Sequence, residues 1–425
     1  MKFRLRYNDS SRIAPGLFLL SLFLVFIQLP AIASVITVHT QEENNSIHRA
    51  LAQAANGDTI LLSPGVYREG NIIIDKSICL LGIPGVILDG ELKYEILSIS
   101  GQHVIVNGIE FRNSGRSGMN DIAAIRCIDA YDIIISHNKI LNAHFGIHVS
   151  NSRHVRIEQN LVEGTPAEEQ NTGNGIHLWK SDTAFIWNNE ILGHRDGIYF
   201  EFVTSSLIQD NISHDNIRYG LHFMFSHHNT YLCNEFRNNG AGVAVMYSNH
   251  VSMEQNLFLH NWGPSAYGLL LKDISDSRIS NNSFINNTIG IHFEGTNRIQ
   301  VSHNIFTGNG WAARVQASCS ENIFRKNSFI ANTFDVGTNG TMILNHFENN
   351  YWDKYEGYDI DKNGIGDIPY HPVSLYSMIV ENDPNCMILL RSVLISFLDK
   401  AEKAIPSITP ENLSDSFPLI KPPIQ

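Results

Sequence analysis

A four-residue motif recurs at nearly constant spacing between about residues 120 and 340. A small residue, usually glycine, is followed by an apolar residue, a variable residue and a second apolar residue. Successive copies start 22, 29, 22, 23, 22, 26, 22 and 22 residues apart. They begin at Ala124, Gly146, Gly175, Gly197, Gly220, Gly242, Gly268, Gly290 and Ala312. A period near 22 predicts a solenoid, in which each coil of three short strands buries its apolar side chains against the next coil. A leucine-rich repeat has a similar period, but its leucine framework is absent.

The alternation inside the motif predicts which side chains face the core. Strand side chains alternate between faces, so the second and fourth positions point inward, and the small residue and the third position point outward. Cys127 stands at an inward position by this rule. An asparagine column runs in phase with the motif, and we interpret it as a stacked turn. Asparagine tolerates left-handed backbone angles, and its amide bonds neighbouring turn groups. Its members are Asn138, Asn160, Asn189, Asn211, Asn234, Asn256, Asn282, Asn304, Asn327 and Asn350.

These patterns predict an all-β chain folded as a right-handed parallel β-helix over residues 34–350. Ser46 is expected to cap a short amphipathic helix that ends before Gly57 and presents Ile47, Leu51 and Ala54 to the first coil. Strands are expected at 59–62 and 72–81. The two long steps place insertion loops at 164–174 and 262–267, and we expect function beside them. Residues 351–425 are expected to form a C-terminal extension with an acidic loop and an apolar helix.

The N-terminus is typical of a secretory signal peptide at residues 1–33. Basic residues precede an apolar run over 17–27, and Ala31-Ile32-Ala33 supplies a small-residue cleavage site. The alternative is an uncleaved membrane anchor. A formal charge of −12 argues against nucleic-acid binding. Five cysteines without a CxxC pair leave at least one thiol unpaired within the chain.

The third motif positions form an expected outward row, which contains the first candidate site. His222 and Met224 share one face of a strand, and Met246 occupies the Met224 position one coil later. Imidazole and thioether ligands suit Cu(I), so His222, Met224 and Met246 are a candidate copper site. The alternative is packing or partner contact. The row comprises Arg126, His148, His177, Tyr199, His222, Ala244, Leu270, His292 and Arg314.

An acidic loop is the second candidate site. Asp359, Asp361, Asn363, Ile365 and Asp367 occupy positions 1, 3, 5, 7 and 9 of an EF-hand-like loop, with glycine at position 6. Position 12 is a tyrosine, which argues against a regulatory EF-hand. The loop is therefore predicted either to bind a structural Ca²⁺ or to be a turn held by its own hydrogen bonds.

A carbohydrate-active site is the third candidate. Exported β-helices that act on uronate polymers as lyases, hydrolases or epimerases need paired carboxylates or calcium-binding aspartates beside a basic residue. His194, Arg195, Asp196 and Glu201 lie close in sequence, and Asp215 follows one coil later. No clear carboxylate pair is evident, so an enzyme or a sugar-binding module is the alternative function.

The tail is the fourth candidate. Leu390, Leu394, Phe397, Ala401 and Ile405 recur at helical spacing after Pro384. Such a helix must bury its apolar surface, and two roles fit. It caps the last coil, or it docks on a partner at the membrane.

Several segments resemble the NosD family of periplasmic maturation factors. They are 218–226 (RYGLHFMFS), 240–248 (GAGVAVMYS), 267–273 (YGLLLKD), 308–312 (GNGWA), 367–373 (DIPYHPV) and the tail around 390–422. The resemblance implies a non-enzymatic periplasmic protein that works with the membrane and ATPase subunits of an ABC transporter. That system assembles the copper–sulfide centre of nitrous oxide reductase, and the implied partners are a copper chaperone lipoprotein and the apo-reductase. Instead of a tight copper site, we expect either a transient Cu(I) contact or a scaffold that holds the chaperone and the reductase together. We expect partner contacts at Tyr199, Lys272, Leu390, Leu394 and Phe397.

Overall fold

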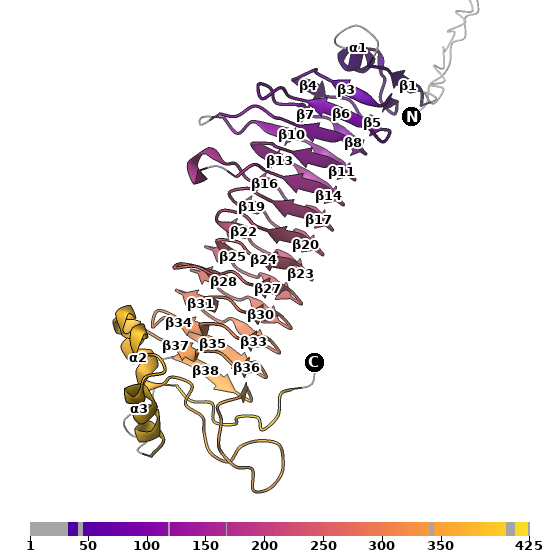
Figure 1. Ribbon diagram of the computed structural model, residues 1–425. Helices are drawn as coiled ribbons and strands as arrows, with labels where there is room; N and C mark the ends of the chain where they lie inside the picture. Colours follow the sequence, from indigo (N-terminus) through magenta and orange to yellow (C-terminus); the bar gives the residue numbers. More distant parts are fainter. Residues whose placement is uncertain are drawn as a thin grey trace, which may run out of the picture. The chain divides into compact units, whose positions relative to one another are not determined.

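The computed structural model describes residues 33–40, 46–117, 120–166, 168–340, 344–404 and 413–423. The predicted signal peptide, apart from Ala33, lies outside this range. Within the described residues, no helix is both long and apolar enough to cross a membrane. Three parallel sheets run through the described chain, and each coil contributes one strand to each sheet (Figure 1).

The first sheet has 14 described strands. They are β1 (Val35–Val38), β2 (Thr59–Leu62), β5 (Cys79–Gly82), β8 (Gln102–Asn107), β11 (Tyr131–Ser136), β14 (Arg153–Glu158), β17 (Phe185–Trp187), β20 (Leu207–Gln209), β23 (Thr230–Leu232), β26 (Ser252–Glu254), β29 (Arg278–Ser280), β32 (Gln300–Ser302), β35 (Ser320–Arg325) and β38 (Leu344–Glu348).

The second sheet has 12 described strands and includes the strands that carry the four-residue motif. They are β4 (Ile72–Ile74), β7 (Leu97–Ile99), β10 (Ala123–Ile128), β13 (Phe145–Ser150), β16 (Ile176–Trp179), β19 (Ile198–Glu201), β22 (Tyr219–Met224), β25 (Ala241–Met246), β28 (Tyr267–Lys272), β31 (Ile289–Glu294), β34 (Trp311–Val315) and β37 (Phe334–Gly337). The predicted strand at 72–81 is therefore two strands, because the chain turns between Ile74 and Cys79 from the second sheet to the first.

The third sheet has 13 described strands. They are β3 (Gly65–Tyr67), β6 (Val86–Asp89), β9 (Glu110–Arg112), β12 (Lys139–Leu141), β15 (Leu161–Glu163), β18 (Glu190–Leu192), β21 (Ile212–His214), β24 (Glu235–Arg237), β27 (Leu257–Leu259), β30 (Ser283–Ile285), β33 (Ile305–Thr307), β36 (Ser328–Ile330) and β39 (Tyr351–Trp352). This parallel solenoid, with its short helices at the two ends, confirms the predicted fold class.

The core lies inside the coils, as the alternation predicts. Ile147 and Val149 are fully buried and are the register partners of Ile125 and Cys127 one coil earlier. Cys127 is also fully buried, and this burial raises the pKa of its thiol to about 12. Phenylalanine rings of the third sheet stack from coil to coil, with Phe258 and Phe284 at a centroid distance of 4.6 Å. Burial of such rings removes apolar surface from water and is the main stabilising contribution expected here.

The glycine column does not face outward, and the prediction for it was wrong. A Cβ on Gly242 would lie 2.4 Å from the carbonyl oxygen of Gly268 and 3.0 Å from Nδ2 of Asn261. A Cβ on Gly220 would lie 3.0 Å from the core ring of Phe236. Gly220 and Gly242 are the second residues of β22 and β25, immediately after the corner at which the chain enters the second sheet, and strand alternation is not yet regular there. They therefore leave no flat outer face for a partner.

The asparagine column forms a continuous hydrogen-bonded ladder. In a typical step the Nδ2 of Asn211 donates to Oδ1 of Asn234 at 3.0 Å, and the same oxygen accepts from the backbone N–H of Asn211. The predicted side-chain bonding is correct, but the predicted left-handed conformation belongs to the preceding residue. Asp210 and Cys233, for example, have φ of 53° and 56°.

A second asparagine ladder, five residues after the first, was missed by the sequence analysis. Its members are Asn216, Asn239, Asn261, Asn287, Asn309 and Asn332. Its constant offset of five residues from the first ladder could have revealed this second ladder from the sequence. Each amide of these ladders bonds to the next coil, so the buried polar atoms at two corners have partners.

At the N-terminus, α1 (Ser46–Gln53) covers the first coils, with Ile47, Leu51 and Ala54 buried as expected. The cap differs from the prediction. Ser46 is the first helical residue, and the carboxylate of Glu69 accepts hydrogen bonds from its hydroxyl at 2.9 Å and from the N–H of Ile47 at 3.0 Å. A carboxylate from a neighbouring coil therefore caps this helix.

At the C-terminus, α2 (Leu375–Asn382), η2 (Pro384–Leu389) and α3 (Val393–Ala404) lie beside the last strands of the second sheet (Figure 1). Tyr376, Val380 and Ile395 pack in one apolar cluster with Trp311 and Phe334. The helices therefore cover the flank of the second sheet. The end of the solenoid is covered by Val373 and Leu413, which join the main core.

Leu390 does not belong to the tail helix, in contrast to the predicted spacing. Its backbone has φ −53° and ψ 132°, and Arg391 is left-handed with φ 65°. Ser392 then accepts a hydrogen bond from the N–H of Ile395 at 3.3 Å, so α3 starts anew after it. Ile405 lies outside the described residues.

Candidate functional site

The third motif positions form a row on the outer side of the second sheet, in the predicted register. His148 pairs with His177, His177 with Tyr199, and Tyr199 with His222. The ring centroids of these three pairs are 4.7, 4.7 and 5.1 Å apart. The predicted ladder of neighbouring side chains is therefore present.

The side chains of the row are buried or half-buried, although we expected them to face solvent. His222 is only 4% exposed because the ring of Tyr219, at a centroid distance of 4.8 Å, lies against it. Phe145 lies near His148, and Tyr267 near His292. Burial lowers the pKa of both His148 and His292 to about 4. Near pH 7 the imidazole rings of His148 and His292 are therefore uncharged.

Met224 and Met246 are register partners on adjacent coils, and both are half-buried. The hydroxyl of Tyr199 lies 3.6 Å from the sulfur of Met224 and 3.4 Å from Oε2 of Glu201. Neither ring nitrogen of His222 has a hydrogen-bond partner among the described residues. His222 and Met224 are two residues apart on β22, and Met246 pairs with Met224 one coil later. One imidazole and two thioethers fit the donor preference of Cu(I), whereas the described chain contains no cluster of three His, Cys, Asp or Glu side chains suited to a metal.

An exposed aromatic strip borders these methionines. Phe202, Phe225 and Tyr247 follow Glu201, Met224 and Met246 by one residue, and each is left-handed. Their rings stack with centroid distances of 5.2 and 5.0 Å. The sequence analysis missed this strip, although an aromatic residue recurs at one fixed offset from the motif. Because the ring faces cover one another, the strip presents ring edges to solvent rather than the open faces on which sugars stack.

A buried charged group lies next to His222. Asp196 is 0% exposed, and its Oδ2 lies 3.5 Å from Nδ1 of His222. The Nε atoms of Arg218 and Arg195 lie 3.6 and 4.0 Å from the same carboxylate. Arg218 also contacts Glu169 of the first insertion loop at 3.4 Å. The insertion loop, with η1 (Glu169–Asn171), thus reaches the candidate copper residues through Arg218 and Asp196.

The carboxylates proposed for carbohydrate chemistry have different contact partners. Asp196 is enclosed by two arginines and His222, whereas Glu201 contacts Tyr199. Asp215 contacts Nδ1 of His214 at 2.5 Å on the third sheet. Within the described chain, these three carboxylates share no hydrogen-bond or ion-pair partner. His194 is fully buried, and this burial lowers its pKa to about 4.

The acidic loop is held by its own hydrogen bonds. Asp359 accepts from the N–H of Gly364 at 2.9 Å, and Asp367 accepts from the N–H of Ile360 at 2.7 Å. Asp361 accepts from Nδ2 of Asn363 at 2.8 Å. This arrangement favours the alternative of a self-bonded turn. Calcium binding by Asp359, Asp361, Asn363, Ile365 and Asp367 stays a prediction.

The predicted partner residues differ in their accessibility. Leu394 and Phe397 on α3 are 61% and 70% exposed, and Leu390 before it is partly exposed. Ile395 points the other way and is buried against the solenoid. Tyr199 and Lys272 are half-buried, and the ammonium of Lys272 lies 2.9 Å from Glu294. The tail therefore offers the larger free apolar surface, while partner contact at these residues stays a prediction.

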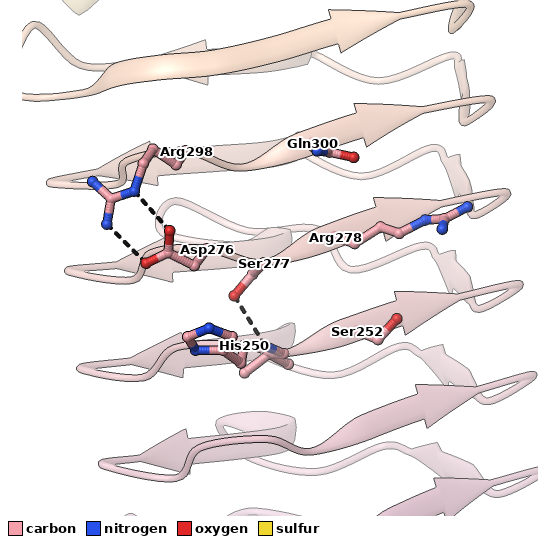
Figure 2. A pocket seen from close by; sticks show the side chains of 8 residues that line it. His250, Ser252, Asp276, Ser277, Arg278, Arg298 and Gln300 are labelled. Atoms are coloured by element: carbon pink, nitrogen blue, oxygen red, sulfur yellow. Dashed lines mark hydrogen bonds and ion pairs between the residues drawn. The ribbon is translucent and has the colours of Figure 1, made fainter.

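A hollow of about 500 Å³ lies on the first sheet, away from these residues (Figure 2). Its lining includes His250, Arg278 and Gln300. The only carboxylate in the lining, Asp276, forms a two-point ion pair with Arg298 at 2.6 and 2.7 Å. The hydrogen bond from Arg298 lowers the pKa of Asp276. A carboxylate held in this way is poorly suited to proton transfer.

Comparisons with known proteins bear on the function of this chain. A family model described as "Periplasmic copper-binding protein (NosD)" matches residues 165–363, and one described as "Right handed beta helix region" matches 35–184. A Pseudomonas aeruginosa protein named "Probable ABC transporter binding protein NosD" is 28% identical over 85% of this chain and 88% of its own length. A protein of the same name from Stutzerimonas stutzeri is 26% identical over 86% and 87%.

Similar solved structures share the fold alone. The catalytic domain of a GH87 α-1,3-glucanase matches with a TM-score of 0.62 at 10% identity, over 76% of this chain and 70% of that one. A family 28 exopolygalacturonase from Yersinia enterocolitica matches with 0.55 at 10% identity, over 76% and 79%. The surface adhesin PfbA of Streptococcus pneumoniae matches with 0.54 at 11% identity, over 72% and 86%. Enzymes and an adhesin occur among them, so the fold does not select a function.

Proposed function

We propose, from its similarity to NosD proteins, that the chain is a periplasmic, non-enzymatic accessory protein for assembling the copper–sulfide centre of nitrous oxide reductase. It acts with the membrane and ATPase subunits of an ABC transporter. A copper chaperone and the apo-reductase are its further partners. The observation that carries this proposal is the exposed apolar side of the tail helix, formed by Val393, Leu394 and Phe397.

The tail is attached to the solenoid on one side and free on the other. Ile395 is 7% exposed and packs with Tyr376 and Phe334, while Val393, Leu394 and Phe397 on the same helix point to solvent. Arg314 of β34 forms an ion pair with Glu381 of α2, which also holds the helices to the second sheet. An apolar face held on a fixed support is a recognition element for a groove in another protein. We assign it to the transporter.

The copper contact is transient and lies at His222, Met224 and Met246. Here copper is cargo on its way to the reductase. The residues that would hold it are one buried imidazole and two half-buried thioethers, which favour Cu(I) over harder ions. The adjoining strip of Phe202, Phe225 and Tyr247 gives a delivering protein an apolar surface next to these donors.

A non-enzymatic role is supported by the separation of the acidic groups. Glycoside cleavage needs two carboxylates at a defined distance on either side of the bond. Asp196 and Glu201 belong to different sets of contacts, and Asp196 is enclosed by Arg195, Arg218 and His222.

The test uses a denitrifying strain whose own copy of the gene is deleted. The strain is complemented with this chain, with the double variant Leu394→Asp/Phe397→Asp, or with Ser396→Asp as the control. Ser396 is exposed on the same helix, so the control adds charge without removing apolar surface. The reductase is purified, and its copper content and copper–sulfide absorption are measured.

We expect full assembly with this chain and with the control, and a reductase lacking the copper–sulfide centre with the double variant. Complete assembly in the deletion strain would overturn the proposed function. Full assembly with the double variant would overturn the role of the tail. If assembly is independent of the chain, turnover of uronate polymers by the purified protein becomes the next measurement.

A further inference from the structure

Two buried polar atoms face each other beside the candidate copper residues without a completed hydrogen bond. Oδ2 of Asp196 and Nδ1 of His222 lie 3.5 Å apart, and neither has a hydrogen-bond partner among the described residues. A buried polar atom left unpaired costs about 1–3 kcal/mol, and more if it is charged. A shift of about half an ångström would give an ordinary bond between them.

The contacts of Asp196 leave its Oδ2 available to the imidazole. Oδ1 accepts from the N–H of Tyr219 at 3.4 Å and lies 3.6 Å from Nε of Arg218. Nε of Arg195 is 4.0 Å from Oδ2, too far for a hydrogen bond. Nδ1 of His222, at 3.5 Å, is therefore closer to Oδ2 than Nε of Arg195 is.

The ring of His222 is held in place by aromatic neighbours. Tyr199 lies on the adjacent coil at a centroid distance of 5.1 Å, and Tyr219 lies at 4.8 Å. With the ring orientation restricted, the tautomer of the imidazole decides which nitrogen can bind a metal. A neutral imidazole that donates from Nδ1 keeps a free lone pair on Nε2.

We infer that Asp196 is a positioning residue for His222. It accepts the Nδ1–H of the neutral imidazole and thereby directs the Nε2 lone pair to Cu(I). Carboxylates behind metal-binding histidines act in this way in many proteins. The inference rests on the copper contact in the proposed function and extends it to a residue that does not touch the metal. The alternative is that Asp196 only neutralises Arg195 and Arg218.

The test has two readouts on the full chain without its leader. Nitrogen-15 NMR of labelled histidine reports the tautomer of His222 in the metal-free protein. Anaerobic competition with the chromophoric chelator bicinchoninate gives the affinity for Cu(I). The variants are Asp196→Asn and, as a matched control, Asp215→Asn, which removes a carboxylate next to His214 on the third sheet. Circular dichroism establishes that each variant is folded.

We expect the Nδ1–H tautomer in the wild-type protein, a loss of this preference in Asp196→Asn, and a 10–100-fold weaker affinity for Cu(I). The control should match the wild type in both readouts. In the double variant Asp196→Asn/His222→Gln, the loss of Cu(I) affinity should be no larger than in His222→Gln alone.

The Nε2–H tautomer in the wild-type protein would overturn the inference without any variant. Additive losses in the double variant would also overturn it, because Asp196 would then act independently of His222. If the wild-type protein has the Nδ1–H tautomer but binds no Cu(I), the inference is overturned, because His222 then binds no copper for Asp196 to direct. The assembly experiment with the deletion strain could still succeed in that case.

Discussion

The carboxylate of Asp415 ends the first asparagine ladder by taking the place of the next asparagine after Asn350. Its Oδ2 accepts from Nδ2 of Asn350 at 3.0 Å, from the N–H of Asn350 at 2.9 Å and from the indole N–H of Trp352 at 3.1 Å. Oδ1 accepts from the N–H of Asn349 at 3.1 Å. The residue is fully buried. A tail residue thus satisfies the donors that the last coil would otherwise leave unpaired.

Removal of this carboxylate should destabilise the end of the solenoid. Asp415→Ala leaves several buried donors unpaired, and we expect the free energy of unfolding to fall by about 2–4 kcal/mol. Asp415→Asn keeps one acceptor in the geometry of the ladder and should cost less. Urea denaturation followed by circular dichroism measures both. Equal losses for the two variants would contradict the ladder interpretation.

A methyl group at a corner glycine should also be costly. In Gly242→Ala the new Cβ would lie 2.4 Å from the carbonyl oxygen of Gly268, so the coils must separate. We expect a loss of about 1–3 kcal/mol in the free energy of unfolding. Gly263→Ala is the matched control, because its Cβ would meet only Ala266 at 3.7 Å. An unchanged free energy of unfolding in Gly242→Ala would show that the two coils can accommodate the added methyl group without separating.

The buried histidines predict loss of stability in mild acid. The pKa of His194 is lowered by burial from 6.5 to about 4, so the unfolded chain binds more protons between these values. The free energy of unfolding should therefore decline as the pH falls from about 6.5 towards 4, by at most about 3 kcal/mol for this residue. Denaturation at pH 7.5, 6.0 and 5.0 measures the slope, and His194→Gln should make it shallower. The same slope in wild type and variant would exclude His194 as a cause.

The two sides of the tail helix should respond differently to truncation. Ile395→Ala removes an apolar group that packs on the solenoid, so backbone amides of α2 and α3 should exchange with solvent faster. Phe397→Ala removes an exposed ring and should leave exchange unchanged. Hydrogen–deuterium exchange of the free protein measures both. Faster exchange in Phe397→Ala would mean that the ring stabilises the tail itself rather than serving a partner.

The sequence alone determined the repeating architecture and most of its register. The alternation of apolar residues and the spacing of the motif identified Ile147, Val149 and Cys127 as core residues, because strand alternation is a local property. The same spacing located the stacked row that contains His148, His177 and His222. The resemblance to the NosD family also came from the sequence, and the comparisons agree with it.

Only the tertiary structure decided which side chains are covered and which polar groups meet. The burial of His222 depends on Tyr219 at the strand's start, and its contact with Asp196 depends on the previous coil. Asp415 reaches Asn350 across 65 residues, which no local pattern reveals. The glycines turned inward because corners interrupt strand alternation. Periodicity predicts the direction of a side chain within a strand, whereas burial and pairing depend on segments that only folding brings together.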